Sequence, residues 1–568
     1  MRPLLAEDVS LAISVVIATF NRAERLRACL DALAAQSRDR STDGRFEVVI
    51  VDDGSTDGTP DLLATYRAPF PLKVIRQENG GQPAALNRGV AEAGGRICLL
   101  MDDDIVAGPG LIDEHLRVQR ETGGVLAAGR LRLSLPAGDW YARRFADEWE
   151  RHYSHLDAGE KPLTAAACYG ANLSFPRDSF LEVGGFARDL ARGYDLDLAY
   201  RLIAAGLAPR YLPRAEAVQD EHKGRRALLR DEERAGEGVV ALYRRLPATL
   251  PVGGLTEFHA ASFAARTCRR FLLAVGVPAT VLSGLGPLLD PPSRGHWYRF
   301  VRAYAFWRGV RRSTSQEEWR GLTGAVTILL YHAVTVAGER PTRFVVDARE
   351  FAWQMGWLAS AGYRVLGLGD YVRSRRNHGL PTGRSVVVTF DDGYVDNGAI
   401  AAPILSSRGL RATLFLVTDS VGTANRWDSE GALAARPILS WEKIRELERS
   451  GVRFAPHGKT HRAMAGLTDE ELASEIGESW AALQRELTDP IPVLAFPFGL
   501  HDEPARAAAE RLGLWGACTA KPGRNTLRTP AYALRRAEIG GDTGRLGFRL
   551  AVRFGDVRPI RNRKRLRS

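Results

Sequence analysis

Two histidines four residues apart, in the segment APHGKTHRA, have a spacing that suits a metal site. His457 and His461 can face one ion from a single helical turn or from a tight loop. Far upstream, the apolar run VVVTF ends in Asp391 and Asp392. A carboxylate would complete an open site for Zn²⁺ or a similar divalent metal, and a neighbouring carboxylate could take a proton from an activated water. These four residues predict metal-assisted hydrolysis.

A second acidic motif, LLMDDDIV, also follows an apolar run. Residues two apart in an extended chain face the same side, so Asp102 and Asp104 can address one cation. Hard oxygen ligands of this kind suit Mg²⁺ or Mn²⁺, which proteins commonly share with a substrate diphosphate. Taken alone, the motif is equally compatible with an ordinary acidic turn.

An apolar run is followed by DDG at two places in the sequence, in VVIVDDGSTDGT at 48–59 and in VVVTFDDGYVDN at 386–397. The residues that follow the two motifs differ, and no fixed period links the two halves of the chain. We therefore interpret them as two sites with different chemistry rather than as an internal repeat.

Alternating strands and helices must position these residues. Up to residue 235, each of the runs ISVVIATF, FEVVIVDD, PLKVIRQ and GRICLLMDDD is short, apolar and closed by polar residues. Such alternation predicts an α/β fold with a mostly parallel, Rossmann-like sheet. Ligands of such sheets bind beyond the carboxyl ends of the strands, where the acidic residues fall. The first helix should bury one face formed by Leu26, Cys29, Leu30 and Leu33.

A second strand–helix series begins at VTILLYHAV and runs to about residue 540. Its longest helix should begin with a capping box of Thr468 and Glu471 and bury Leu472, Ile476, Leu483 and Leu487. A shorter helix should begin after Ser440 and end before Gly451.

The length of 568 residues predicts more than one domain. We expect the following organisation: an α/β domain at 1–235, a helical connector at 236–325, a second α/β domain at 326–545 and a basic tail at 546–568. The tail, ending in RNRKRLRS, is either a solvated end or a binding arm.

The connector contains an uncharged stretch, FLLAVGVPATVLSGLGPLL at 271–289, flanked by arginines on both sides. It is just long enough to span a bilayer, but its glycines and prolines argue against spanning. The next segment, HWYRFVRAYAFWRGVRR, is basic and aromatic, which suits a helix at a membrane interface. Peripheral contact through 271–312, an ordinary core and a true span all remain open.

Composition sets further bounds. A net charge of +11 favours an anionic partner such as a nucleotide diphosphate or lipid headgroups. The sequence contains no recognisable nucleic-acid recognition motif, so we expect no nucleic-acid partner. Five widely spaced cysteines indicate a reducing compartment, and LAISVVIATF resembles a core strand more than a signal peptide. We expect a cytoplasmic protein, in one variant placed at the cytoplasmic face of the membrane.

The ordered motifs of the first domain, over about residues 12–235, resemble the family-2 glycosyltransferases, which have the GT-A fold. The motifs are ATFNR, VVIVDDGSTDGT, NGGQPAALNRG, LLMDDDIV, GANLSFPRDSF, GGF and YDLDLAYRL. The resemblance implies inverting transfer of a sugar from a nucleotide-sugar donor to an acceptor hydroxyl. It implies nucleotide binding by Thr19, Asn21, Asp53 and Asp102, and a metal on the diphosphate held by Asp104.

Asp195, in GYDLDLAYRL, matches the catalytic aspartate of that family, which takes the proton of the attacking hydroxyl. The glutamate that usually precedes it is Tyr194 here, so local tuning differs. His222, in DEHKGRR, lies where many of these enzymes place a histidine near the metal or diphosphate; a surface histidine is the alternative.

The set TFDDG, HGKTH and FPFG resembles the metal-dependent polysaccharide deacetylases of carbohydrate esterase family 4, over about residues 326–540. This resemblance implies a distorted β/α barrel, with Asp391 as general base and with Asp392, His457 and His461 as metal ligands. FPFG, at 496–499, would be the substrate-groove motif.

The sequence departs from that family in two ways. The arginine that often precedes FPFG and steadies the base is absent, and so is the C-terminal histidine that acts as general acid. Protonation of the leaving amine would then fall to metal-bound water, to His501 or to nothing. His332, in LLYHAV, is a further candidate, unless it simply packs at a strand end.

These readings combine into one functional expectation. The enzyme would transfer an N-acetylhexosamine, most simply from UDP-N-acetylglucosamine, to a glycan, lipid-linked or small-molecule acceptor and then remove the acetyl group. The alternative is a glycosyltransferase whose second domain binds an acetylated glycan without cleaving it.

Overall fold

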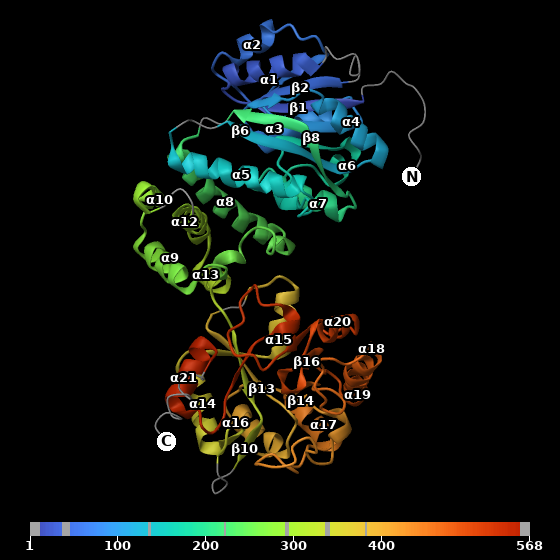
Figure 1. Cartoon of the computed structure of the whole chain (residues 1–568), viewed down its shortest axis with the longest axis vertical. Coiled ribbons are helices and arrows are strands. Elements are labelled where there is room, and N and C mark those ends of the chain that lie inside the picture. Colours follow the sequence, from blue (N-terminus) through green and yellow to red (C-terminus); the bar gives the residue numbers. More distant parts are fainter. Residues whose placement is uncertain are drawn as a thin grey trace. The chain divides into compact units, whose positions relative to one another are not determined.

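The computed structural model describes residues 12–36, 46–134, 138–220, 223–289, 295–335, 341–380 and 383–556. The chain forms two compact units, labelled by element in Figure 1. The first comprises Met1–Leu255 and Ala261–Thr314, and the second comprises Thr256–Ala260 and Ser315–Ser568. Most of the helical segment that we predicted as a connector therefore packs with the first unit.

The first unit is built on an eight-stranded sheet with the order β3-β2-β1-β4-β7-β6-β8-β5. Strands β3, β2, β1 and β4 are parallel to one another, and β7 runs antiparallel to both of its neighbours. This mixed, parallel-rich sheet confirms the predicted α/β class. The strands are β1 Ile13–Thr19, β2 Phe46–Asp52, β3 Leu72–Arg76, β4 Ile97–Asp102, β5 Ile105–Ala107, β6 Leu126–Ser134, β7 Asn172–Pro176 and β8 Pro209–Asp220.

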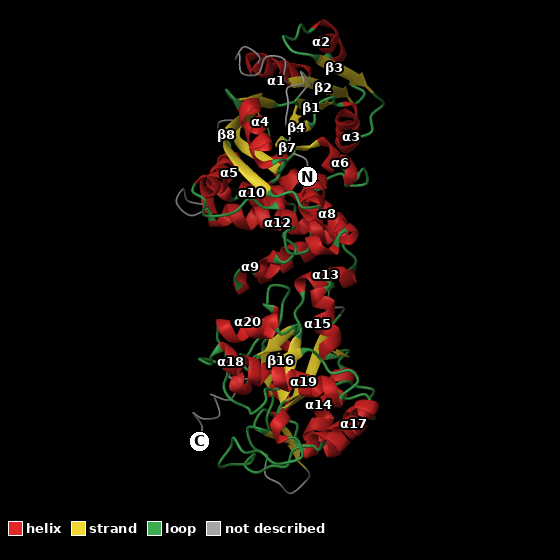
Figure 2. Cartoon of the chain, turned by 90° about the vertical axis from the view of Figure 1, so that its right-hand side faces the viewer, coloured by secondary structure: helices red, strands yellow, loops and turns green. Residues whose placement is uncertain are grey.

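Helices lie on both faces of this sheet, as Figure 2 shows, which explains why its central strands are apolar throughout. Helix α1 buries the predicted face of Leu26, Cys29, Leu30 and Leu33. The helices are α1 Ala23–Gln36, α2 Thr59–Thr65, α3 Gln82–Glu92, α4 Leu111–Thr122, α5 Trp140–Asp157, α6 Arg177–Glu182 and α7 Tyr194–Ala204.

The strand order brings the polar ends of three strands together. β1 lies between β2 and β4, with Thr19 opposite Asp52 and Ala18 opposite Asp102 in the register. Three runs that are 27 or more residues apart in sequence thus end at one edge, because parallel strands share the direction of their carboxyl ends.

A layer of five helices completes the first unit: α8 Arg225–Arg245, α9 Phe263–Val275, α10 Ala279–Gly284, α11 Gly286–Leu289 and α12 His296–Ser313. Among the described residues, no helix combines the length and apolar character needed to cross a membrane.

Helix α12 bears on the alternatives for the connector. Its basic and aromatic sequence suits a membrane interface, with an ordinary core as an alternative, and Tyr298, Tyr304 and Trp307 are buried. Its arginines pair with acidic residues of α8 and α5: Arg302 lies 2.6 Å from Glu232 and 2.7 Å from Glu148. The aromatic side of the helix is therefore part of the core of the first unit, which favours the core alternative for residues 296–312.

The second unit is a distorted barrel of parallel strands, as predicted. The main sheet has the order β15-β14-β13-β9-β18, with β12 also paired to β13, and β16 pairs with β17. Backbone contacts join the two sheets on both sides, from Ile491 N to Phe454 O and from Thr519 N to Leu534 O. The strands are β9 Thr327–Tyr331, β10 Ala333–Thr335, β11 Val345–Asp347, β12 Arg364–Leu366, β13 Ser385–Phe390, β14 Thr413–Leu416, β15 Arg453–Pro456, β16 Val493–Ala495, β17 Gly516–Cys518 and β18 Arg536–Glu538.

Helices surround this barrel, and the predicted helix starts are confirmed. Thr468 and Glu471 form a reciprocal capping box, and Ser440 accepts a hydrogen bond from the Lys443 backbone. The helices are α13 Gln316–Thr323, α14 Ala348–Ser360, α15 Leu368–Arg376, α16 Ala402–Ser406, α17 Trp441–Arg449, α18 Asp469–Leu472, α19 Ser479–Glu486, α20 Glu503–Arg511 and α21 Gly544–Phe554.

Candidate active sites

Both DDG motifs form a sharp turn at the end of a buried strand. Gly54 has φ of 85° and Gly393 has φ of 75°, in the left-handed region that favours glycine. A Cβ on Gly393 would also lie 2.5 Å from a methyl carbon of Leu416. The turns place the preceding aspartates, which are all buried, at the strand ends, and the surroundings of the two pairs differ completely.

In the first unit, Asp53 organises a loop. One carboxylate oxygen accepts hydrogen bonds from Gly80 N (2.9 Å) and Gln77 Nε2 (2.7 Å), and the other accepts one from Gly81 N (2.8 Å). These hydrogen bonds hold the NGG segment in place at the start of α3. Asn21, in left-handed conformation with φ of 55°, accepts from the backbone of 56 and 57 in the same way. Asp53 and Asn21, two of the four predicted nucleotide-binding residues, thus hold the loops at the carboxyl ends of the strands.

The DDD motif lies at the end of β4 and is bridged by a cation that the sequence analysis did not single out. Arg22 contacts Asp103 Oδ1 at 2.9 Å and Asp104 Oδ2 at 3.1 Å. Thr19 donates to the other oxygen of Asp103 at 2.8 Å. Arg22 belongs to the ATFNR motif, and only the fold brings it across to residues about 80 positions later. These clustered carboxylates have the hard oxygen donors that Mg²⁺ and Mn²⁺ prefer.

Asp102 lies beside this cluster and is connected by hydrogen bonds to residues of helices α3 and α7. Gln82 donates to its Oδ1 at 2.8 Å, and Tyr194 donates to Gln82 at 2.8 Å. Burial, followed by repulsion from Asp104 and other nearby carboxylates, raises the pKa of Asp102 to about 8. The Gln82 amide therefore links Tyr194 to Asp102.

Asp195 lies in the first turn of α7, where Gly193 with φ of 79° starts the helix. Its Oδ2 accepts a long hydrogen bond of 3.3 Å from Gly170 N. Its Oδ1 is shielded from solvent and has no hydrogen-bond partner among the described residues. Burial raises the pKa of Asp195 to about 6. An incompletely paired carboxylate of raised pKa is suited to accept a proton from an incoming hydroxyl.

We predict that sugar transfer is lost in acid as Asp195 becomes protonated. Because only the carboxylate form can take a proton, turnover should rise with pH through about 6 and be about tenfold lower at pH 5 than on the plateau. Initial rates at saturating donor and acceptor between pH 5 and 8 measure this. A flat profile over that range would contradict the assignment, and Asp195→Glu should move the midpoint.

His222 lies outside the described residues, so its predicted place near the diphosphate remains a prediction.

In the second unit, Asp392, His457 and His461 converge as predicted. They are the one group of three or more His, Cys, Asp or Glu in the described chain whose donor atoms all lie within 4.8 Å of one another. Asp392 Oδ1 lies 3.5 Å from His457 Nε2 and 3.3 Å from His461 Nε2. All three side chains are buried, and Asp392 Oδ1 has no hydrogen-bond partner among the described residues. Two imidazole nitrogens and one carboxylate oxygen around a common point fit a divalent metal.

The surrounding backbone holds the three side chains in place. His457 Nδ1 donates to Ala495 O at 2.8 Å, which orients the ring with Nε2 directed at the cluster. Asp392 and His461 have φ of 76° and 69°, a conformation rare for residues other than glycine. Such strain persists only where the fold dictates it, and it frequently marks functional positions.

Asp391 is held by a buried arginine that the sequence analysis missed. Arg536, in β18, donates to both carboxylate oxygens of Asp391, at 2.6 and 2.8 Å. Burial alone would raise the pKa of Asp391, but the charges of Arg536 and His457 outweigh it and hold this pKa below its usual range. No arginine precedes FPFG, as the sequence analysis noted; the arginine that pairs with Asp391 comes instead from a strand 145 residues away.

Removing Arg536 should damage both the fold and the site. Arg536→Met leaves a buried carboxylate without its partner, so the free energy of unfolding should fall by about 3–5 kcal/mol. The pKa of Asp391 should rise, and the acid limb of the hydrolysis profile should move to higher pH. Denaturant unfolding and acetyl release as a function of pH measure the two effects.

Arg343 provides the control, because it pairs with Glu538 on the same strand but at the exposed rim of the cavity, at 2.9 Å. Arg343→Met should change the free energy of unfolding by less than about 1 kcal/mol. Equal losses in the two variants would show that the Asp391–Arg536 pair has no special role.

A cavity of about 250 Å³ opens over these residues. His332 is part of its lining, and its Nδ1 has no hydrogen-bond partner among the described residues. His501 is not part of the lining; it stacks on Phe496 with ring centres 4.6 Å apart. The structure thus brings His332, and not His501, to the predicted hydrolytic site.

Aromatic side chains flank the same cavity. Trp427 stacks on His461 at 4.3 Å between ring centres, and Phe498 of the FPFG motif approaches the same imidazole at 4.6 Å. Phe498 is 54% exposed, so part of its ring remains open to a ligand. Trp427 lies in a long loop that carries no sequence signal for this site.

Comparisons with known proteins agree with this division. Residues 14–184 match the family described as glycosyl transferase family 2, and residues 378–517 match the family described as polysaccharide deacetylase. A 235-residue region is 27% identical to glycosyltransferase AglE of Haloferax volcanii, covering 41% of this chain and 74% of that protein. A 212-residue region is 27% identical to YxkH of Bacillus subtilis, a polysaccharide deacetylase by its name, covering 37% of this chain and 70% of that protein.

Among solved structures, the chain is similar to the Streptococcus pyogenes deacetylase PplD in complex with acetate. The sequences are 23% identical, the TM-score is 0.35, and the match covers 40% of this chain and 98% of that chain.

Proposed function

We propose that this chain, which combines a family 2 glycosyltransferase domain with a polysaccharide deacetylase domain, makes an aminosugar conjugate in two steps. The first domain transfers an N-acetylhexosamine, N-acetylglucosamine from its UDP donor in the simplest case, to an acceptor hydroxyl with inversion. The second removes the acetyl group by metal-assisted hydrolysis. The acceptor is a glycan, a lipid-linked sugar or a small molecule.

The observation that carries the proposal is the group of Asp392, His457 and His461 with the Asp391–Arg536 pair in the second unit, in the same chain as a match to a glycosyltransferase family in the first. A domain that only bound glycan would have no need of a buried Asp391–Arg536 pair next to three converging metal ligands. Because hydrolysis of an acetamide needs an N-acetylated sugar, that arrangement also supports the choice of donor.

In the transfer step, the residues of the first unit bind and orient the reactants. Asp102 and the loop fixed by Asp53 border the nucleotide, while Asp104 would hold Mg²⁺ or Mn²⁺, which would supply positive charge to the leaving diphosphate. Arg22, now bridging Asp103 and Asp104, has to release Asp104 for this. Asp195 takes the proton of the acceptor hydroxyl.

In the hydrolytic step, Asp392, His457 and His461 would hold Zn²⁺ or a similar ion, which would supply an activated water and polarise the acetyl carbonyl. Asp391, kept ionised and oriented by Arg536, accepts the proton of that water. His332 lines the same cavity and donates a proton to the leaving amine. This is the general-acid role that the sequence analysis left unassigned.

Mass spectrometry of the acceptor tests the two steps together. Wild-type protein with UDP-N-acetylglucosamine, a divalent metal and a panel of lipid, oligosaccharide and small-molecule acceptors should add an N-acetylhexosamine that later loses its acetyl group. Consumption of plain hexose donors in place of N-acetylated ones would overturn the pairing of the two domains. Sugar addition without acetyl loss would favour the alternative, a binding domain, for which the missing C-terminal histidine is the one argument.

A further inference from the structure

Helices α9, α10 and α11, residues 263–289, form a layer that is firmly attached on one side. The single hydroxyl proton of Tyr304 is shared between Val277 O at 2.5 Å and Leu272 O at 3.2 Å, and Trp297 donates to Leu282 O at 3.1 Å. Gly286 lies so close to the ring of Trp140 that a Cβ would be 1.8 Å from it. The inner face of this layer is therefore part of the core of the first unit.

The outer face of the same layer is apolar and exposed. Seven of the seventeen large apolar side chains that are exposed in the described part of the chain lie within these 27 residues. The other ten are scattered over the two units. An apolar surface of this density is uncommon on a monomer and marks a surface that makes contact with something else. Its residues, between 44% and 82% exposed, are Phe263, Phe271, Val275, Val281, Leu285, Leu288 and Leu289; we refer to them as the apolar face.

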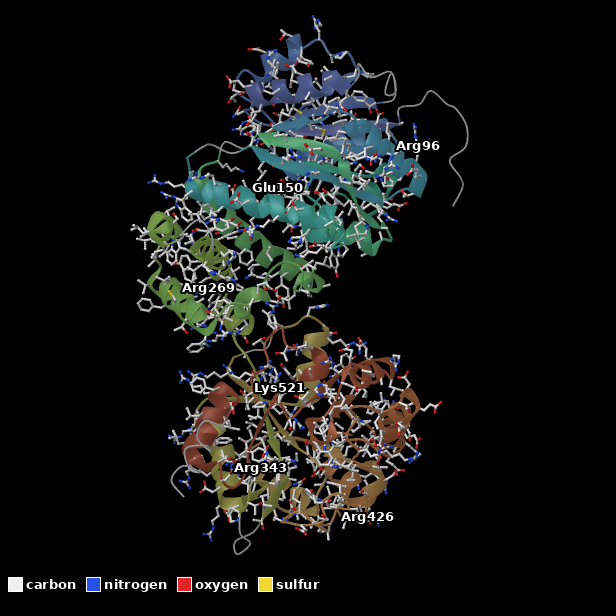
Figure 3. All side chains as sticks on the ribbon, in the orientation of Figure 1. Arg96, Glu150, Arg269, Arg343, Arg426 and Lys521 are labelled. Carbon is white, nitrogen blue, oxygen red and sulfur yellow. The ribbon has the colours of Figure 1, made fainter. Side chains whose placement is uncertain are left out.

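The charged side chains within the segment from Phe258 to Leu289 are basic, because it contains no Asp or Glu. In α9, Arg270 is exposed and Arg266 half-buried, whereas Arg269, labelled in Figure 3, is buried. On α9 the exposed side chains of Phe263 and Phe271 lie eight residues apart, on one stripe, with Arg270 exposed beside it. Apolar side chains next to basic ones complement the acyl chains and anionic headgroups of a lipid leaflet.

The dimensions favour lying on a membrane over crossing it. The 13 residues of α9 extend about 20 Å, less than the roughly 30 Å of a hydrocarbon core. Helices α10 and α11 are shorter still, with six and four residues. The layer can therefore insert side chains into one leaflet while its inner face stays on the protein.

We propose that the apolar face docks the first unit onto the surface of a bilayer that contains anionic lipids. Phe271 and Leu288 enter the boundary between headgroups and acyl chains, and Arg266 and Arg270 of α9 meet the negative headgroups, while Arg269 is buried. This contact replaces the one expected through 271–312, because α12 is buried and α9 extends the surface toward residue 263. The inference stands apart from the proposed function, since it requires neither activity.

Sedimentation of the full-length protein with vesicles tests it. Protein should sediment with vesicles of phosphatidylcholine mixed with phosphatidylglycerol, less with phosphatidylcholine alone, and less at high salt. Leu288→Asp and Phe271→Asp should each lower the partition coefficient by about tenfold or more, because a charge replaces an inserted apolar group. Arg266→Glu with Arg270→Glu should lower it on the anionic vesicles only.

Leu181→Asp is the matched control, because Leu181 is a 42% exposed leucine on α6, outside the apolar face. It should bind vesicles like wild type, and circular dichroism should show that all variants remain folded. Equal binding by wild type and Leu288→Asp would overturn the proposal. So would self-association in the absence of lipid that Leu288→Asp abolishes, because the face would then be an interface between copies of the chain.

Discussion

Replacing Asp391 by asparagine should lower the rate of acetyl release by about 10²- to 10⁴-fold, the usual contribution of a positioned general base. The amide keeps the size of the carboxylate and can still accept a hydrogen bond from Arg536 through its one oxygen, but it cannot take the proton of the attacking water. Sugar transfer should be unchanged, because Asp195 and the DDD motif belong to the other unit. Acetate release from an N-acetylated product, followed beside sugar incorporation, measures both.

Asp428 offers a control within the same cavity. It lines the cavity as Asp391 does, but its carboxylate accepts a hydrogen bond from Asn425 at 2.7 Å. Asp428→Asn should reduce acetyl release far less than Asp391→Asn. If both variants kept more than a tenth of the wild-type rate, Asp391 would not be the base.

Asp195→Asn should abolish sugar transfer to a comparable extent and leave acetyl release intact. The loss should not reflect unfolding. Burial raises the pKa of Asp195 to about 6, so its ionised form is disfavoured in the folded protein above that pH. A neutral side chain removes this penalty, and the free energy of unfolding at pH 8 should be equal to or higher than that of wild type. Transfer rates and denaturant unfolding, measured together, separate a catalytic defect from a structural one.

Asp189→Asn is the comparison for this variant. Asp189 lies six residues earlier, is exposed, and pairs with Arg245 at 3.3 Å. Its loss should change transfer little. A large loss in Asp189→Asn, or a substantial residual rate in Asp195→Asn, would contradict the role given to Asp195.

The sequence by itself predicted the features that depend on neighbours along the chain. The buried face of α1, the capping box at Thr468 and the carboxylates at the strand ends are all local patterns. The two histidines of the metal cluster were also found this way, because a four-residue spacing constrains where two side chains can lie. The family resemblances added an expected fold and activity for each of the two domains.

Other parts of the two sites depend on strands and loops that only the fold brings together. Arg536 reaches Asp391 because β18 and β13 both pair with β9, and no sequence spacing encodes that neighbourhood. Arg22 meets the DDD motif because β1 lies beside β4. Trp427 and His332 enter the cavity from separate loops, which left the choice between His332 and His501 open until the structure was known.

The helices after residue 236 show most clearly what the sequence alone does not determine. A basic, aromatic helix suits a membrane interface and a protein core equally well, because either the membrane or the rest of the protein can bury its aromatic side chains and pair with its arginines. In α12 the partners are Glu148 and Glu232 of the chain itself, while the outer side chains of α9–α11 have no such cover in the described structure. Periodicity shows that a face is apolar; only tertiary packing decides whether the protein itself covers that face, because the same free energy of burial is available from a core and from a membrane.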